Sequence, residues 1–93
     1  MSDELQNWRK KIDAIDAQIL ENLVARNLIS QKVAAEKCKK NLPVFDQNRE
    51  KQIFENLKRR AEKLKLSPKA IDEIFRIILR ESREVQKRRL AEN

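Results

Sequence analysis

The sequence predicts an all-α protein with three helices in a single domain. The chain of 93 residues contains no glycine and only two prolines, Pro43 and Pro68, so it offers few positions for sharp turns. Its apolar residues recur at spacings of three and four, which is the period of a helix with one buried face. Charged residues are abundant but mixed in sign, and together with the helical period this argues against disorder.

The first helix is expected over residues 4–39, because no helix breaker occurs in this range. Its apolar stripe consists of Trp8, Ile12, Ile15, Ile19 and Leu23. At ~1.5 Å per residue such a helix is about 52 Å long, whereas a compact globule of this chain length is about 30 Å across. The remaining residues are too few to cover the stripe, and we therefore expect a homodimer, in which a second copy supplies the cover.

The second helix follows the first break in the pattern, at residues 40–45. Pro43 disfavours helical conformation at Leu42. Asp46 then has the position and side chain of an N-cap, which predicts a helix over residues 47–64.

The third helix is predicted to begin at Ser67 and Pro68, with serine as the N-cap and proline as the first helical residue. We expect this helix to run over residues 68–90. No internal repeat or low-complexity tract divides the chain, so residues 1–93 are expected to form one domain.

Composition narrows the possible chemistry. Without histidine the chain has no imidazole for acid–base catalysis, and the single cysteine, Cys38, cannot build a thiolate zinc site. We expect Cys38 to be a small, partly buried packing residue. Without glycine, neither a phosphate-binding loop nor a dinucleotide fingerprint is possible. We expect no metal and no cofactor, so that any catalysis relies on Arg, Lys, Gln, Ser and carboxylates.

Charge and hydropathy indicate the compartment and the kind of partner. The net charge of +7 favours anionic partners through long-range attraction. No stretch approaches the ~20 apolar residues that a membrane-spanning helix needs, and the N-terminus lacks the basic start and apolar run of a signal peptide. One cysteine fits a reducing compartment. We expect a cytoplasmic protein that does not bind membranes.

Polar side chains interrupt the apolar stripe of the first helix. Continued beyond Leu23, the stripe meets Arg26, Ser30, Val33 and Lys37. Arg26 and Lys37 are eleven residues apart, close to three helical turns, and therefore point the same way. Each alone could extend from the edge of a buried face into solvent. Together they predict a pocket for a small anion, because unpaired cations in a core cost several kcal/mol.

The other two helices contribute further polar residues to their inner faces. Asp46, Arg49 and Glu50 share one side of the first two turns of the second helix, and Ser82 and Gln86 lie one turn apart on the third. Simpler readings are a structural cap for Asp46, a carboxylate partner for Arg49, and an interhelical hydrogen bond for Ser82 and Gln86.

Eight polar positions form one ordered pattern along the chain. The pattern reads Leu5-x-x-x-Arg9-x-x-Ile12-x-x-Ile15-Asp16, then Arg26 and Lys37, then Pro43-x-x-Asp46-x-x-Arg49-Glu50, and finally Ser82-x-x-x-Gln86. In this pattern the chain resembles the all-helical chorismate mutases over nearly its whole length, without a gap or substitution at the eight polar positions. The resemblance implies that three helices from each of two chains interlace into a dimer with two active sites. It also implies an isomerase of aromatic amino acid biosynthesis. Such an enzyme converts chorismate to prephenate, a Claisen rearrangement on the shikimate-pathway route to phenylalanine and tyrosine.

The resemblance also implies roles for the eight residues. Arg26 and the partner subunit's Arg9 would hold the two carboxylates of the substrate, with Ser82 and Arg49 completing these contacts. Lys37 and Gln86 would donate hydrogen bonds to the ether oxygen, and Glu50 and Asp46 would receive the ring hydroxyl. The helix geometry agrees with the position given to Arg9. Arg9 and Arg26 are seventeen residues apart, about 25 Å along one helix, so a small molecule cannot touch both in one chain.

Two alternatives remain open from the sequence. An isochorismate-pyruvate lyase on the same scaffold would share the arginines and Lys37, and the pair of Asp46 and Glu50 favours the mutase. A basic helical nucleic-acid-binding module would account for the charge of +7 and for the run of Lys and Arg after Asn56. The cations of interest lie on inner faces that DNA cannot reach, so we expect no nucleic-acid partner.

Overall fold

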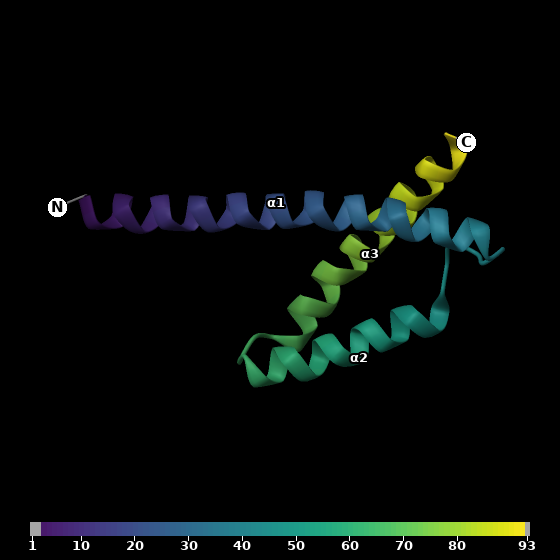
Figure 1. Ribbon diagram of the computed structural model, residues 1–93. Coiled ribbons are helices and arrows are strands. Elements are labelled where there is room, and N and C mark those ends of the chain that lie inside the picture. The colour runs from purple at the N-terminus through teal and green to yellow at the C-terminus, as the bar shows by residue number, and fades with distance from the viewer. Residues whose placement is uncertain (1–2, 93) are drawn as a thin grey trace.

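The computed structural model describes residues 3–92, and within this range it contains three helices and no strand (Figure 1). The helices are α1 (Asp3–Lys39), α2 (Gln47–Lys63) and α3 (Pro68–Ala91). The prediction of an all-helical chain with one very long helix is confirmed. Each helix differs from its expected range by one residue at one end.

The three helices are arranged around α3, which begins near the end of α2, runs back beside α2 and then crosses the C-terminal half of α1 (Figure 1). Within the described range, the backbones of α1 and α2 do not approach each other. The N-terminal half of α1 projects beyond the other two helices, and the molecule measures 60 × 30 × 15 Å. Its radius of gyration of 17.0 Å exceeds the ~12 Å of a compact chain of this length.

The core of a single chain is small. Its buried apolar residues are Ala34, Ala61, Leu79 and Val85, and among residues 3–92 no large side chain is fully buried. Ala34 follows Ser30 by one turn on α1, and Ser30 forms a hydrogen bond to Ser82 of α3. Small side chains on α1 therefore mark the crossing point, where they let the two helix backbones approach closely.

The projecting half of α1 carries an apolar face that the rest of the described chain leaves exposed. This face consists of Leu5, Trp8, Ile12, Ile15 and Ile19, which are between 52% and 60% exposed. Burying one such side chain would stabilise the folded state by about 1.5–3 kcal/mol. No helix within the described residues has the combination of length and apolar character that crossing a membrane requires.

The starts of α2 and α3 follow the predicted capping. The Asp46 side chain accepts a hydrogen bond from the Arg49 backbone N–H at 3.0 Å, and the Ser67 hydroxyl accepts one from the Ala70 N–H at 3.2 Å. Pro68 is the first residue of α3. Both predicted N-caps are confirmed, because each side chain satisfies a backbone donor that the first helical turn leaves free.

The ends of α1 and α2 use left-handed residues although the chain has no glycine. Asn41 and Lys65 have φ angles of 57° and 59°. The N–H of Leu42 bonds to the Lys37 carbonyl at 2.8 Å, and Leu66 closes the end of α2 in the same way. Asparagine tolerates this conformation, whereas for lysine the contact between Cβ and the following carbonyl is unfavourable.

We predict that Lys65→Gly raises the free energy of unfolding by about 1 kcal/mol, because glycine removes the Cβ contact in the left-handed conformation. Urea unfolding followed by circular dichroism, at one fixed protein concentration, measures the change. Lys58→Gly in the middle of α2 is the control, and it should lower the same free energy by about 1 kcal/mol. A loss of stability for Lys65→Gly would contradict this account of the helix end.

Candidate functional site

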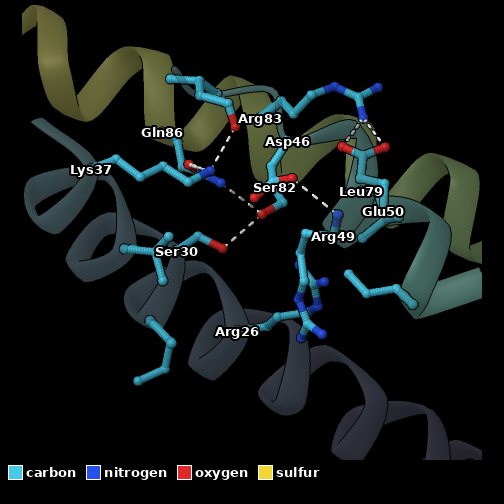
Figure 2. Close-up of a pocket in the computed structure, with 14 residues that line it drawn as sticks. Arg26, Ser30, Lys37, Asp46, Arg49, Glu50, Leu79, Ser82, Arg83 and Gln86 are labelled. Atoms are coloured by element: carbon cyan, nitrogen blue, oxygen red, sulfur yellow. Dashed lines mark hydrogen bonds and ion pairs between the residues drawn. The ribbon is translucent and has the colours of Figure 1, made fainter. Parts of the chain in front are cut away.

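A cavity of about 320 Å³ lies between the three helices, in the size range of small-molecule sites (Figure 2). It is lined by Arg26, Ile29, Ser30, Val33 and Lys37 of α1, by Val44 and Asp46 of the connecting segment, by Arg49, Glu50 and Ile53 of α2, and by Leu79, Ser82, Arg83 and Gln86 of α3. Each of the three helices contributes both apolar and polar side chains to the wall of the cavity.

The cavity brings together seven of the eight polar residues singled out in the sequence. The seven are Arg26, Lys37, Asp46, Arg49, Glu50, Ser82 and Gln86. Arg9 is the exception, since it is exposed on the projecting half of α1 and does not line the cavity. At seventeen residues from Arg26, it lies about 25 Å away along the helix.

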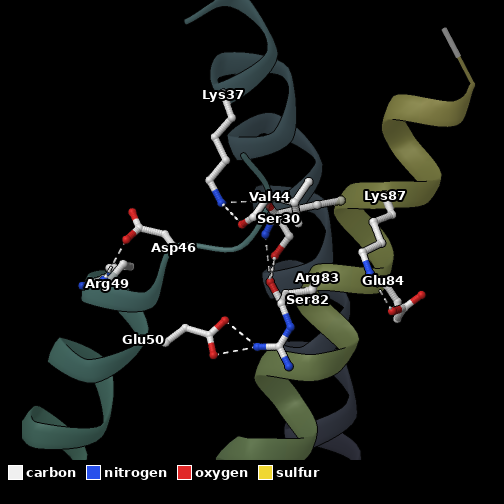
Figure 3. A network of polar contacts seen from close by, with 11 residues as sticks. Ser30, Lys37, Val44, Asp46, Arg49, Glu50, Ser82, Arg83, Glu84 and Lys87 are labelled. Carbon is white, nitrogen blue, oxygen red and sulfur yellow. Dashed lines mark hydrogen bonds and ion pairs between the residues drawn. The ribbon is translucent and has the colours of Figure 1, made fainter. Parts of the chain in front are cut away.

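Lys37 extends from α1 toward the connecting segment and α3. Its Nζ donates hydrogen bonds to the backbone carbonyl of Val44 at 2.6 Å and to Oε1 of Gln86 at 2.9 Å (Figures 2 and 3). An ammonium group has three N–H donors. One N–H of Lys37 is therefore left for a ligand in the cavity.

The buried end of the cavity is a short chain of hydrogen bonds between α3 and α1. Gln86 is only 6% exposed, and its Nε2 donates to the Ser82 hydroxyl at 3.4 Å. The hydroxyls of Ser82 and Ser30 lie 2.8 Å apart, so Ser82 does form an interhelical hydrogen bond, as the simpler reading of its position had it. With its carbonyl bound to Lys37 and its amide bound to Ser82, Gln86 has a fixed orientation and a second N–H still available.

Arg26 and Arg49 place two positive charges on facing walls of the cavity (Figure 2). Burial lowers the pKa of the Arg26 guanidinium, and the like charge of Arg49 lowers this pKa further. Neither guanidinium has an ion-pair partner among residues 3–92. Arginine remains protonated at neutral pH, so an anion entering the cavity would relieve both the desolvation and the repulsion.

Arg83 is a cavity residue that the sequence did not reveal. Its Nη1 lies 2.6 Å and 2.5 Å from the two carboxylate oxygens of Glu50 (Figure 3). Arg83 follows Ser82 by one residue and is rotated from it by about 100° around α3, so helical periodicity places it off the inner face. Its partner is 33 residues away on another helix. No local spacing signal exists for such a pair.

The charges that line the cavity do not balance. The cations are Arg26, Lys37, Arg49 and Arg83, and the anions are Asp46 and Glu50. Four cations against two carboxylates leave an excess of two positive charges. Asp46 serves both as the N-cap of α2 and as part of the wall, because only one of its oxygens accepts the capping bond. The electrostatic balance favours a small molecule with two negative charges.

Cys38 lies outside the cavity, and its predicted partial burial is wrong, because its side chain is exposed. It follows Lys37 by one residue and is rotated from it by about 100°, away from the cavity. Among the residues that the structure describes, no three His, Cys, Asp or Glu side chains come together in a group that could hold a metal ion.

The amino-acid sequence of the chain matches the model of a known protein family. Residues 8–87 match the family described as chorismate mutase type II. The match covers all of α2, most of α1 and α3, and every residue that lines the cavity.

Individual relatives agree with the family match. The chain is 32% identical to the chorismate mutase of Methanocaldococcus jannaschii over 92 residues, which are 99% of this chain and 93% of the relative. It is 34% identical to a bifunctional chorismate mutase/prephenate dehydratase of Buchnera aphidicola, over 95% of this chain but 24% of that protein. A protein of the same name from Aquifex aeolicus is 40% identical over 57 residues, or 61% of this chain and 16% of the relative.

We predict that Arg49→Gln raises the free energy of unfolding of the ligand-free protein by about 0.5 kcal/mol, because it removes a like charge that faces Arg26. The same change should abolish the stabilisation that a dicarboxylate such as malonate gives the unsubstituted protein. Urea unfolding with and without malonate, at constant ionic strength, measures both effects.

Lys51→Gln is the matched control, because Lys51 lies on α2 outside this cavity and the substitution removes the same charge. It should bring no gain in ligand-free stability and should keep the response to malonate. A loss of ligand-free stability in Arg49→Gln would show that the two arginines do not repel each other.

Proposed function

Because the chain belongs to the type II chorismate mutase family, we propose that the cavity between α1, α2 and α3 is where it binds and rearranges chorismate. As a chorismate mutase, the protein converts chorismate to prephenate, a step in the biosynthesis of phenylalanine and tyrosine. The reaction is intramolecular, since one C–O bond breaks and one C–C bond forms. The observation that carries the proposal is the cavity itself, which contains two arginines without an ion-pair partner among residues 3–92, together with Lys37 and the amide of Gln86.

The first task of the site is to hold the substrate in its reactive shape. Chorismate carries two carboxylates, and the cavity has an excess of two positive charges. Arg26 and Arg49 have no carboxylate partners among residues 3–92, so their planar guanidinium groups are free to bind substrate carboxylates. Ser82 completes these contacts. Gripping the two carboxylates brings the reacting carbon atoms close together, which lowers the entropic part of the barrier.

The second task is to stabilise the charge that develops when the C–O bond breaks. Lys37 and Gln86 each have one N–H without a protein partner, and their side chains are already in mutual contact at 2.9 Å. We place the ether oxygen of chorismate at these two donors. A fixed donor of this kind is worth about 3–4 kcal/mol, or a factor of 10² to 10³ in rate. Lys37 carries a full charge and is expected to contribute more than Gln86.

The third task is to recognise the ring hydroxyl. Glu50 and Asp46 line the α2 side of the cavity, and each carboxylate has lone pairs beyond those used by Arg83 or by the helix cap. We assign the hydroxyl of chorismate to this pair. Isochorismate carries its hydroxyl at another ring position, so the pair favours a mutase over an isochorismate-pyruvate lyase.

The complete site requires a second chain. We propose an interlaced homodimer in which the projecting half of α1 enters the partner subunit, where the partner's cavity receives Arg9. Two observations support this arrangement. The apolar face from Leu5 to Ile19 is not covered by the other residues of the range 3–92 in its own chain. Arg9 is separated from its own cavity by about 25 Å of rigid helix.

We predict that Lys37→Ala lowers kcat for chorismate by about 10²- to 10³-fold, because the substitution removes the charged donor at the ether oxygen. The disappearance of chorismate, followed by absorbance, measures the rate, and isochorismate is assayed in parallel. Lys39→Ala is the control. Lys39 is exposed on the last turn of α1 and outside the cavity, so its loss should not change kcat. Near-normal turnover by Lys37→Ala, with the fold intact, would remove Lys37 from the mechanism.

We predict that two inactive variants restore activity when their subunits are mixed. Arg9→Ala and Lys37→Ala each inactivate a homodimer, but a mixed dimer has one site with both residues intact. Random exchange of equal amounts should therefore restore about one quarter of the unsubstituted activity. If Arg9 acted in the cavity of its own chain, every mixed dimer would lack one of the two residues at each site. Mixing would then restore nothing, and the interlaced arrangement would be wrong.

A further inference from the structure

The ion pair between Arg83 and Glu50 holds one wall of the cavity in place. We infer that Arg83 is a positioning residue, which fixes the Glu50 carboxylate in the orientation that receives the substrate's ring hydroxyl. This inference rests on the proposed role of Glu50. Arg83 itself does not have to contact the substrate.

The contact differs from the other ion pairs between described residues. Those pairs, which are Lys39–Glu36, Arg76–Asp72, Lys87–Glu84 and Arg88–Glu81, each lie within one helix and on an exposed surface. Arg83 and Glu50 join α3 to α2, and their side chains are 28% and 21% exposed. Partial burial reduces screening by solvent and salt, so this pair is held more firmly than a surface pair.

Arg83 is also fixed from a second direction. Its guanidinium carbon lies 5.5 Å from the centre of the Phe45 ring, within the range of a cation–π contact. Phe45 immediately precedes Asp46, the N-cap of α2. Arg83 therefore connects α3 to the entry of α2 through Phe45, and to the first turn of α2 through Glu50, the contact that Figure 3 shows.

This connection matters because α2 has no direct backbone contact with α1 in the described range. The distance between the α2 wall, with Asp46 and Glu50, and the α1 wall, with Lys37, depends on how α2 is held against α3. A free glutamate samples several side-chain rotamers, whereas a glutamate bound through both oxygens is restricted to few. Its remaining lone pairs can then face the cavity.

Arg83 has an electrostatic effect on the same reaction. Without its charge, the excess of two positive charges around the cavity would fall to one. Glu50 would then present an uncompensated negative charge to a substrate with two carboxylates. The charge of Arg83 offsets the negative charge of Glu50. The Glu50 carboxylate can then accept a hydrogen bond from the substrate hydroxyl without repelling the two substrate carboxylates.

A double-mutant cycle with Glu50 tests the inference. We predict that Arg83→Ala lowers kcat/KM for chorismate by about 10- to 100-fold, and that in a Glu50→Gln background the same substitution changes kcat/KM by less than about threefold. Arg83→Lys should recover part of the loss, because an ammonium still pairs with the carboxylate but lacks the planar guanidinium. Arg80→Ala is the matched control. Arg80 is exposed on α3 outside the cavity and should leave kcat/KM unchanged in both backgrounds.

The outcomes separate the inference from the function on which it rests. An equal effect of Arg83→Ala in both backgrounds, or no effect in either, would overturn the positioning role. If Glu50→Gln alone left kcat/KM unchanged, the role of Glu50 would fail and the inference with it, while Lys37→Ala would still test the mutase mechanism. If Arg83→Ala lost its helical circular dichroism, Arg83→Lys would take its place in the cycle. Its smaller loss, about three- to tenfold, should likewise vanish in the Glu50→Gln background.

Discussion

The site depends on α3 as the common partner of two helices, α1 and α2, whose backbones do not approach each other within residues 3–92. The Ser30–Ser82 hydrogen bond fixes α1 against α3, and the Arg83–Glu50 ion pair fixes α2 against α3. The first contact is buried and the second is partly buried. Because the opposite walls of the cavity belong to α1 and α2, their separation depends on how each of these helices packs against α3. This arrangement gives a chain with a very small core a defined cavity.

The same cavity is unfavourable for the folded protein when it is empty of ligand. The pKa of Arg26 is lowered because burial and the nearby charge of Arg49 both disfavour its protonated form. The repulsion between the two arginines therefore destabilises the folded state of the ligand-free protein. A dianionic substrate reverses the sign of this interaction. The repulsion in the free protein and the attraction in the complex have one cause, namely two positive charges that line the same cavity.

The sequence predicted the helices and most of the cavity, because both follow from helical period. Asp46 and Ser67 act through neighbours three residues away, and Arg26 and Lys37 lie on one stripe, so local spacing was sufficient. The role of Arg83 was not predicted, because its contact with Glu50 depends on how two helices pack and on the length of the arginine side chain. Cys38 was misjudged since composition suggests burial for cysteine, whereas its angular position on α1 leaves it in solvent.

The partners of Lys37 have a consequence for its strength as a donor. The backbone carbonyl of Val44 and the amide oxygen of Gln86 are both uncharged acceptors. They orient the ammonium group without neutralising it, whereas a carboxylate at the same place would compete with the ligand for the lysine. Lys37 is therefore held rigidly and keeps its whole positive charge available to the molecule in the cavity.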